Sequence, residues 1–132
     1  MKGNIIQAIG FASMKHKGQK RSDGKDYITH PVSVYEILTN VTENEDILIA
    51  SILHDTVEDT KTTYDEIVEL FGEGVGDYVM EVTKNTIDEA KYDIKTKGGL
   101  LIKLADMLHN ASDDDPKIRQ KMRMIRMERG KK

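Results

Sequence analysis

Cysteine is absent from this 132-residue sequence, and proline occurs only twice. Without cysteine, the chain can form neither a disulfide bond nor a thiolate metal site. No stretch approaches the roughly 18 consecutive apolar residues of a membrane-spanning helix. Residues 1–9 contain one lysine and no long apolar run, so they lack the pattern of a secretory signal peptide. These absences fit a cytoplasmic protein, and we expect no interaction with a membrane.

Charge is unevenly distributed along the chain. The net charge of −3 argues against a protein that wraps duplex nucleic acid. Basic residues gather in segments 15–25 and 117–132, whereas the acids concentrate between them. A basic cluster that faces an acidic metal site would suit a compact polyphosphate ligand. The alternative is that these side chains form a solvated surface. The basic C-terminal stretch lacks the interleaved aromatic residues typical of single-stranded nucleic-acid binding.

The scarcity of proline and of alternating β-branched runs predicts a helical protein. Apolar residues at helical spacing indicate a first helix over about residues 3–17, followed by a loop over 18–25. Pro31 lies where it can occupy the first turn of a second helix. A third, almost entirely apolar helix should reach its end near His54 and Asp55, and its composition predicts a central position.

Capping patterns indicate further helix boundaries. Thr42 with Glu45, and Thr63 with Glu66, have the spacing of capping boxes, and Gly72 is placed to end the helix that follows the second box. A fifth helix should follow Gly72. We expect a loop or a poor helix over residues 84–97.

The C-terminal third predicts a helix with a core stripe of four residues, Leu101, Leu104, Ala105 and Leu108. A last helix is expected from Asp115 and Pro116. We therefore predict an all-α orthogonal bundle that forms one domain over residues 1–132, in which residues 113–132 are a short basic helix or tail.

Four separated pieces of the sequence carry groups suited to metal chemistry: His30-Pro31, His54-Asp55, Glu58-Asp59, and Asp106 with Asn110. Two imidazoles and two carboxylates, with no thiolate, suit a divalent ion such as Mn²⁺, Fe²⁺ or Zn²⁺. On the helix around Asp106, the side chains of Lys103, Asp106 and Asn110 should share one side, roughly opposite the leucine stripe. That side could bind a metal, a ligand oxygen and a phosphate together.

Each piece also has a simpler interpretation. A histidine before proline, as at His30, often lies at a helix N-terminus or on the surface. Glu58 and Asp59 could be a frayed acidic helix end. His54 and Asp55 follow an apolar helix, where burial of ionisable groups is costly unless they are paired or bind a metal. If that helix continues, Glu58 lies one turn beyond His54 and beside it. Each signal is weak alone, but their joint occurrence favours a metal site.

The order of these residues is similar to the signature of the HD-domain metal-dependent phosphohydrolases. More specifically, the sequence resembles the hydrolase domain of the RelA/SpoT proteins and their small stand-alone relatives over about residues 5–112. The resemblance is carried, in order, by His16 to Gln19, Arg21, Asp23-Gly24, Tyr27 to Pro31, Leu53 to Thr60, Phe71-Gly72, Val82 to Lys84 and Lys103 to Asn110. The segments Leu53 to Thr60 and Lys103 to Asn110 are the most specific.

The resemblance implies a function and a set of site residues. The family removes the 3′-pyrophosphate from the guanosine polyphosphates ppGpp and pppGpp. By position, the implied ligands of a divalent metal, usually Mn²⁺, are His30, His54, Asp55 and Asp106. Glu58 and Asp59 match the acids that activate the attacking water, Asn110 matches an amide that contacts the nucleotide, and Arg21 matches the basic residue beside the guanine. The candidates for offsetting charge on the leaving pyrophosphate are Lys17, Lys20, Lys25 and Lys103.

Three other residues in the matching strings receive smaller roles. We expect His16 and His109 to stay outside the metal's ligand set and to give at most indirect support, with His109 at the side of its helix. Tyr27 is interpreted as a packing residue rather than a participant in the chemistry.

The sequence departs from the family pattern in three ways. It lacks a synthetase domain, the connection between Lys84 and Lys103 is short, and only about twenty residues follow Asn110. The short C-terminal segment favours association into a homo-oligomer. Two other functions stay open: an HD phosphohydrolase for another nucleotide, such as NADPH, and a catalytically silent nucleotide binder.

Overall fold

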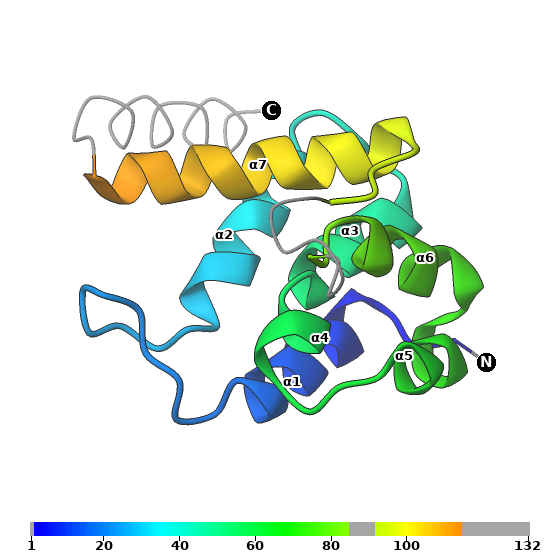
Figure 1. Ribbon diagram of the computed structural model, residues 1–132, viewed down its shortest axis with the longest axis horizontal. Helices are drawn as coiled ribbons and strands as arrows, with labels where there is room; N and C mark the ends of the chain where they lie inside the picture. Colours follow the sequence, from blue (N-terminus) through cyan, green and yellow to red (C-terminus); the bar gives the residue numbers. More distant parts are fainter. Residues whose placement is uncertain (1, 85–91, 115–132) are drawn as a thin grey trace.

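A computed structural model of the protein describes residues 2–84 and 92–114 and is built from α-helices (Figure 1). In these ranges the helices are α1 (Ile5–Lys15), α2 (Thr29–Leu38), α3 (Glu45–Leu53), α4 (Thr56–Asp59), α5 (Tyr64–Phe71), α6 (Glu73–Glu81) and α7 (Lys97–Asp114). The described residues contain no strand, only one isolated β-bridge between Lys20 and Asp26. The prediction of an all-α fold is confirmed.

Helix α3 lies at the centre of the bundle and packs against α1, α2, α6 and α7. All of its residues from Ile47 to Leu53 are buried, as the apolar sequence of this helix predicts. The central position follows because a helix that is apolar on every side must be covered on every side. The end of α3 therefore delivers the following residue, His54, directly into the interior.

The helix boundaries agree with most of the sequence signals. Pro31 lies in the first turn of α2, Thr63 Oγ1 accepts a hydrogen bond from the backbone N–H of Glu66 at 3.1 Å, and Gly72 ends α5 with a φ of 99°. The capping box expected at Thr42 is wrong. Asn44 is the N-cap of α3, and its Oδ1 accepts from the N–H of Ile47.

The leucine stripe predicted for α7 is wrong at two positions. Leu104 and Leu108 are exposed, whereas the neighbouring Ile102 and Ala105 are buried. The reason lies in the close approach of α7 to the bundle. A Cβ atom built on Gly98 would lie 2.5 Å from the ring of Tyr78, so this end of α7 contacts its neighbours through backbone. That packing turns the side of α7 with Gly98, Ile102 and Ala105 towards the bundle.

The predicted last helix, from Asp115, lies outside the described residues. No helix in the described part of the chain is long and apolar enough to cross a bilayer. The association into a homo-oligomer stays a prediction.

Candidate metal centre and active site

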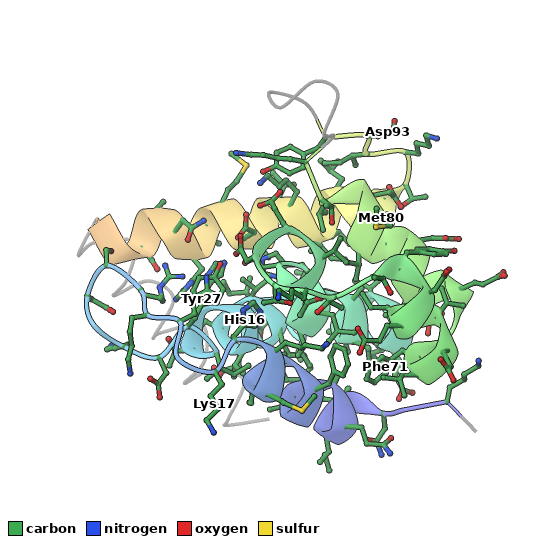
Figure 2. The ribbon with its side chains drawn as sticks, turned by 60° about the horizontal axis from the view of Figure 1, so that its bottom comes forward. His16, Lys17, Tyr27, Phe71, Met80 and Asp93 are labelled. Atoms are coloured by element: carbon green, nitrogen blue, oxygen red, sulfur yellow. The ribbon has the colours of Figure 1, made fainter. Side chains whose placement is uncertain are left out.

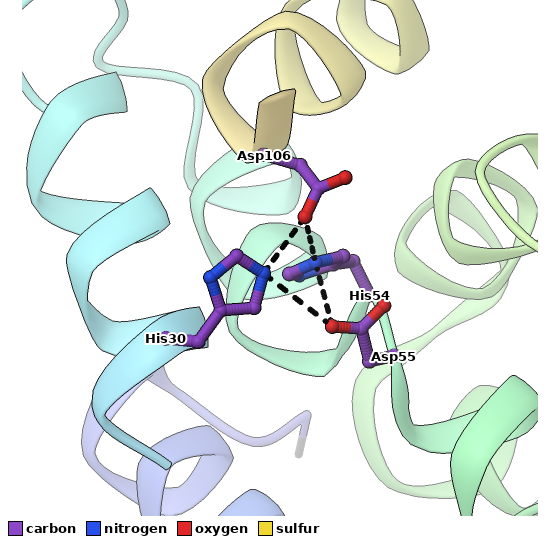
Figure 3. Close-up of side chains that lie close together, drawn as sticks. All are labelled: His30, His54, Asp55 and Asp106. Carbon is purple, nitrogen blue, oxygen red and sulfur yellow. Dashed lines mark hydrogen bonds and ion pairs between the residues drawn. The ribbon is translucent and has the colours of Figure 1, made fainter. Parts of the chain in front are cut away.

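Four side chains from distant parts of the sequence converge beside α3 (Figure 3). His30 belongs to the first turn of α2, His54 follows the last residue of α3, Asp55 precedes α4, and Asp106 lies on α7. One donor atom from each residue lies within 4.8 Å of the donor atoms of the other three. His30 and His54 are almost completely buried, and Asp106 is 8% exposed.

The contacts inside the cluster are short. His30 Nε2 lies 2.7 Å from Asp106 Oδ1, and His54 Nε2 lies 3.2 Å from the same oxygen. Asp55 Oδ2 lies 3.0 Å from His54 Nε2 and 3.6 Å from His30 Nε2. Both imidazoles thus point their Nε2 atoms at the same pair of carboxylates, which is the arrangement of a four-ligand ion site.

A break in the chain direction between α3 and α4 creates half of this cluster. His54 is the C-cap of α3, and its Nδ1 lies 2.6 Å from the carbonyl oxygen of Ser51. Because a carbonyl can only accept, Nδ1 carries the proton, and Nε2 faces the carboxylates. The helix α3 ends before it reaches Glu58, so the i, i+4 arrangement of His54 and Glu58 within one continuous helix is not formed.

The electrostatics of the cluster follow from burial and opposite charge. Burial lowers the pKa of His54, but the Asp55 charge and hydrogen bonds to Asp106 and Asp55 outweigh it and raise the pKa to about 10. Burial raises the pKa of Asp55, yet the charge of His54 lowers it to about 2. Burial also acts on Asp106, whose pKa is nevertheless held well below its usual range by hydrogen bonds from the two histidines.

The donor set fits a divalent cation. The two carboxylates, Asp106 buried and Asp55 half-buried, need positive charge beside them, and Lys103 Nζ supplies part of it at 3.3 Å from Asp106 Oδ2. A divalent ion would supply that charge directly and would accept the four nitrogen and oxygen donors. The protein therefore has a His/Asp cluster that could bind a divalent metal.

The two acids of α4 line a pocket beside this cluster. Glu58 Oε1 accepts a hydrogen bond from the backbone N–H of Lys84 at 2.8 Å, which ties α4 to the segment after α6. Partial desolvation and the charges of Asp55 and Glu58 raise the pKa of Asp59. The pocket is lined by Tyr27, His30, His54, Asp55, Glu58, Asp59, Val82, Lys84, Tyr92, Lys103, Asp106 and Asn110.

The residues expected to bind a substrate extend from the cluster along α7. Lys103 Nζ lies 3.3 Å from Asp106 Oδ2, and Asn110 Nδ2 lies 3.5 Å from Asp106 Oδ1. The three side chains therefore share one side of α7, as the spacing predicts. That side is adjacent to the buried Ala105 rather than opposite the core, which differs from the prediction. Arg21 reaches this end of the site, where its Nη2 donates to Asn110 Oδ1 at 3.2 Å.

The hydroxyl of Tyr27 is a contact that the sequence interpretation missed. It donates a hydrogen bond to Asp55 Oδ2 at 2.6 Å. Burial and the charge of Asp55 raise the pKa of this phenol above its usual value, so it stays a donor. The ring also packs on His16, with ring centroids 4.8 Å apart (Figure 2). The sequence signal that could have identified Tyr27 as a site residue was its position in the segment Tyr27 to Pro31, which carries part of the family resemblance.

His109 lies beside the cluster. Its Nδ1 lies 2.7 Å from His30 Nδ1, and the two rings are stacked with centroids 5.0 Å apart. His109 is not among the four residues whose donor atoms converge, but it contacts one of them, His30. The indirect support expected of His109 stays a prediction. His16 lies farther out, where its Nδ1 contacts Gln19 Oε1 at 3.0 Å.

Comparison with known proteins accounts for this arrangement. The sequence profile described as "HD domain" matches residues 8–98, which is more than half of the chain. The chain is also 40% identical over 124 residues to the mouse guanosine-3′,5′-bis(diphosphate) 3′-pyrophosphohydrolase MESH1, a match covering 83% of this chain and 68% of that protein. The chain belongs to the RelA/SpoT-type HD-domain family.

Other members of the RelA/SpoT-type HD-domain family agree in sequence and fold. The bifunctional (p)ppGpp synthase/hydrolase SpoT of Escherichia coli K12 is 38% identical over 123 residues, which cover 80% of this chain and 17% of SpoT. A solved structure of a metazoan SpoT orthologue, described as hydrolysing ppGpp, superposes with a TM-score of 0.75 at 31% identity. That likeness covers 86% of this chain and 71% of the other. The predicted HD-domain fold is thereby confirmed.

Proposed function

We propose that this protein is a Mn²⁺-dependent guanosine-3′,5′-bis(diphosphate) 3′-pyrophosphohydrolase, which converts ppGpp or pppGpp to GDP or GTP and pyrophosphate. The observation that carries the proposal is the convergence of the His30, His54, Asp55 and Asp106 donor atoms within 4.8 Å. The likeness to MESH1, whose name states this reaction, supports the choice of substrate.

The four converging residues would hold the metal. Their imidazole and carboxylate donors suit Mn²⁺ as well as Fe²⁺ or Zn²⁺. When bound, the ion would polarise a phosphate oxygen and lower the pKa of a nearby water molecule. The buried walls around His30 and His54 keep these donors in one orientation before any ligand arrives.

Glu58 and Asp59 are proposed to handle the proton of the attacking water. Both line the pocket that contains the cluster, and the raised pKa of Asp59 favours a carboxylate that accepts a proton readily. The oxygen of water forms a bond to phosphorus, the bond between the ribose 3′-oxygen and the pyrophosphate breaks, and the 3′-oxygen takes up a proton. The hydrogen bond from Lys84 to Glu58 keeps one of the two acids oriented.

Substrate binding is assigned to the residues along α7 and to the loop before α2. Lys103 would pair with the pyrophosphate, since its ammonium lies beside the cluster and over the ring of Tyr92. Asn110 and Arg21, which contact each other, would bind the nucleoside end, where the planar guanidinium can stack on a base. The two ends of the substrate would then lie along one face of α7.

The direct test is incubation of the purified protein with Mn²⁺ and ppGpp, with separate measurement of GDP and pyrophosphate. Stoichiometric release of both products is expected. A panel that includes pppGpp, NADPH and other ribose phosphates defines the substrate class in the same assay. No turnover of ppGpp by protein that demonstrably binds Mn²⁺ would reject the proposal, and turnover of another panel member would redirect it.

Variants separate the proposed roles. Glu58→Gln and Asp59→Asn should lower kcat by about 10²–10⁴-fold, the typical contribution of general acid–base catalysis, while metal binding persists. Arg21→Ala should mainly raise KM. Ile6→Ala, at a position of α1 that is 79% exposed, provides a control that should behave as wild type. If Glu58→Gln and Asp59→Asn lost the metal instead, their assignment to proton transfer would be wrong.

A further inference from the structure

Each histidine of the cluster has a second ring nitrogen that faces away from the carboxylates. In His54 this atom, Nδ1, meets the backbone carbonyl of Ser51 at 2.6 Å. In His30 it meets a side chain, because Nδ1 of His30 lies 2.7 Å from Nδ1 of His109. The first partner belongs to the main chain and cannot be removed by mutation. The second depends entirely on the residue at position 109.

The His30–His109 contact constrains where the protons lie. Two nitrogens at 2.7 Å must share one hydrogen, since two hydrogens would collide and two lone pairs would repel each other. A neutral imidazole that binds a cation through Nε2 carries its proton on Nδ1. The proton of the shared contact would then belong to His30, and His109 would accept it through Nδ1.

We infer that His109 is a positioning residue that holds His30 in the tautomer and ring orientation needed for binding metal through Nε2. This inference rests on the metal site of the proposed function and adds a residue outside its four ligands. The stacked rings, with an interplanar angle of 26°, restrict rotation of His30 as well. Partners of this kind typically change metal affinity or activity by 10–100-fold when they are lost.

The position of His109 on α7 gives the contact a second consequence. Asp106 and His109 are three residues apart on the same helix, so α7 supplies one proposed ligand and the partner of another. His30 belongs to α2, and its Nε2 contacts Asp106 while its Nδ1 contacts His109. Both nitrogens of the His30 ring thus contact side chains of α7.

Substitutions at position 109 test the inference. His109→Phe keeps an aromatic ring and removes both nitrogens, whereas His109→Asn places an amide near the position of Nδ1. Met107→Ala, at a 55% exposed position of α7, is the control for a change in the same helix. Mn²⁺ affinity is measured by titration calorimetry on metal-free protein, and the ligand geometry is followed by the visible absorption of the Co²⁺ form.

His109→Phe should raise the Mn²⁺ dissociation constant by about 10–100-fold and alter the Co²⁺ spectrum. His109→Asn and Met107→Ala should stay close to wild type in both measurements. A His109→Phe protein that binds Mn²⁺ as tightly as wild type, with the same Co²⁺ spectrum, would overturn the inference. The same assay tests the metal site itself. Absence of metal binding in the wild type would reject both the proposed function and this inference. Unchanged Mn²⁺ binding and an unchanged Co²⁺ spectrum in His109→Phe would reject only this inference.

A second measurement needs no variant, which matters if His109→Phe fails to fold. Nitrogen NMR of the Zn²⁺-loaded wild-type protein distinguishes protonated from unprotonated ring nitrogens. Protons on His30 Nδ1 and His109 Nε2 are expected. A proton on His109 Nδ1 in the loaded protein would contradict the inference, because His30 would then lack a partner that accepts from it.

Discussion

The phenol of Tyr27 donates a 2.6 Å hydrogen bond to the same Asp55 oxygen that lies 3.0 Å from His54 Nε2. One proposed metal ligand is thereby oriented by a residue from the loop before α2. Because the donor neutralises no charge, its effect on the site is directional: it selects which lone pair of Asp55 Oδ2 faces the cluster.

Tyr27→Phe should therefore weaken Mn²⁺ binding or lower activity by about 10–100-fold while the protein keeps its fold. Tyr64→Phe is a matched control, since that hydroxyl bonds Asp77 at the exposed surface 2.7 Å away. Calorimetric titration and turnover assays on both variants check the expectation. Equal losses in the two variants would show that the effect is not specific to Asp55.

Metal binding should stabilise the fold measurably. Ions that bind only the folded state add about 2.7 kcal/mol of unfolding free energy at a hundredfold excess over Kd. We expect Mn²⁺ to raise the melting temperature of the wild type, and a chelator to reverse the change. Asp106→Ala removes an oxygen that contacts both histidines, so its melting temperature should not respond to Mn²⁺. A full response in this variant would place the ion elsewhere.

The metal-free protein should lose stability at both ends of the pH scale. The pKa of His54 is raised from 6.5 to about 10, so its contribution is complete below pH 6.5 and is lost as the pH rises towards 10. The pKa of Asp55 is lowered from 3.8 to about 2, so its contribution is complete above pH 3.8 and is lost as the pH falls towards 2. Urea unfolding across this range measures both losses.

The alkaline part of this profile has an internal control. His54→Gln should lack the additional loss between pH 6.5 and 10, because it has no imidazolium to deprotonate. Wild type and variant are compared at each pH, so lysine and tyrosine titration cancels. Identical profiles in this range would mean that His54 is not protonated in the metal-free site.

Two glycines of the helices should respond in opposite directions to alanine. Gly98→Ala places a Cβ 2.5 Å from the Tyr78 ring and 3.1 Å from Ile47, and overpacking of this kind costs about 1–3 kcal/mol. Gly10 in α1 has no atom within 4 Å of its Cβ position, so Gly10→Ala should stabilise by up to ~1 kcal/mol through helix propensity. Urea unfolding of both variants decides the matter, and a stabilising Gly98→Ala would refute close packing at this end of α7.

The sequence was sufficient for the helical class, the central position of α3 and the residues that converge at the site. Apolar spacing and N-cap residues such as Thr63 act within a few neighbours, so they can be interpreted locally. The order of His30, His54, Asp55 and Asp106 along the chain also indicates a common site, since it resembles a family motif. The roles proposed for these residues stay predictions until the experiments above are done.

Only the tertiary structure decided which side of α7 meets the bundle and which partners surround the ligands. Apolar content favoured Leu104 and Leu108 for the core, yet both are exposed and Ile102 is buried, because the close approach at Gly98 turns another side of α7 towards the bundle. The contact of His109 with His30 spans 79 positions of the chain. Local sequence patterns report preferences within one helix, whereas such a contact depends on how two helices are placed against each other.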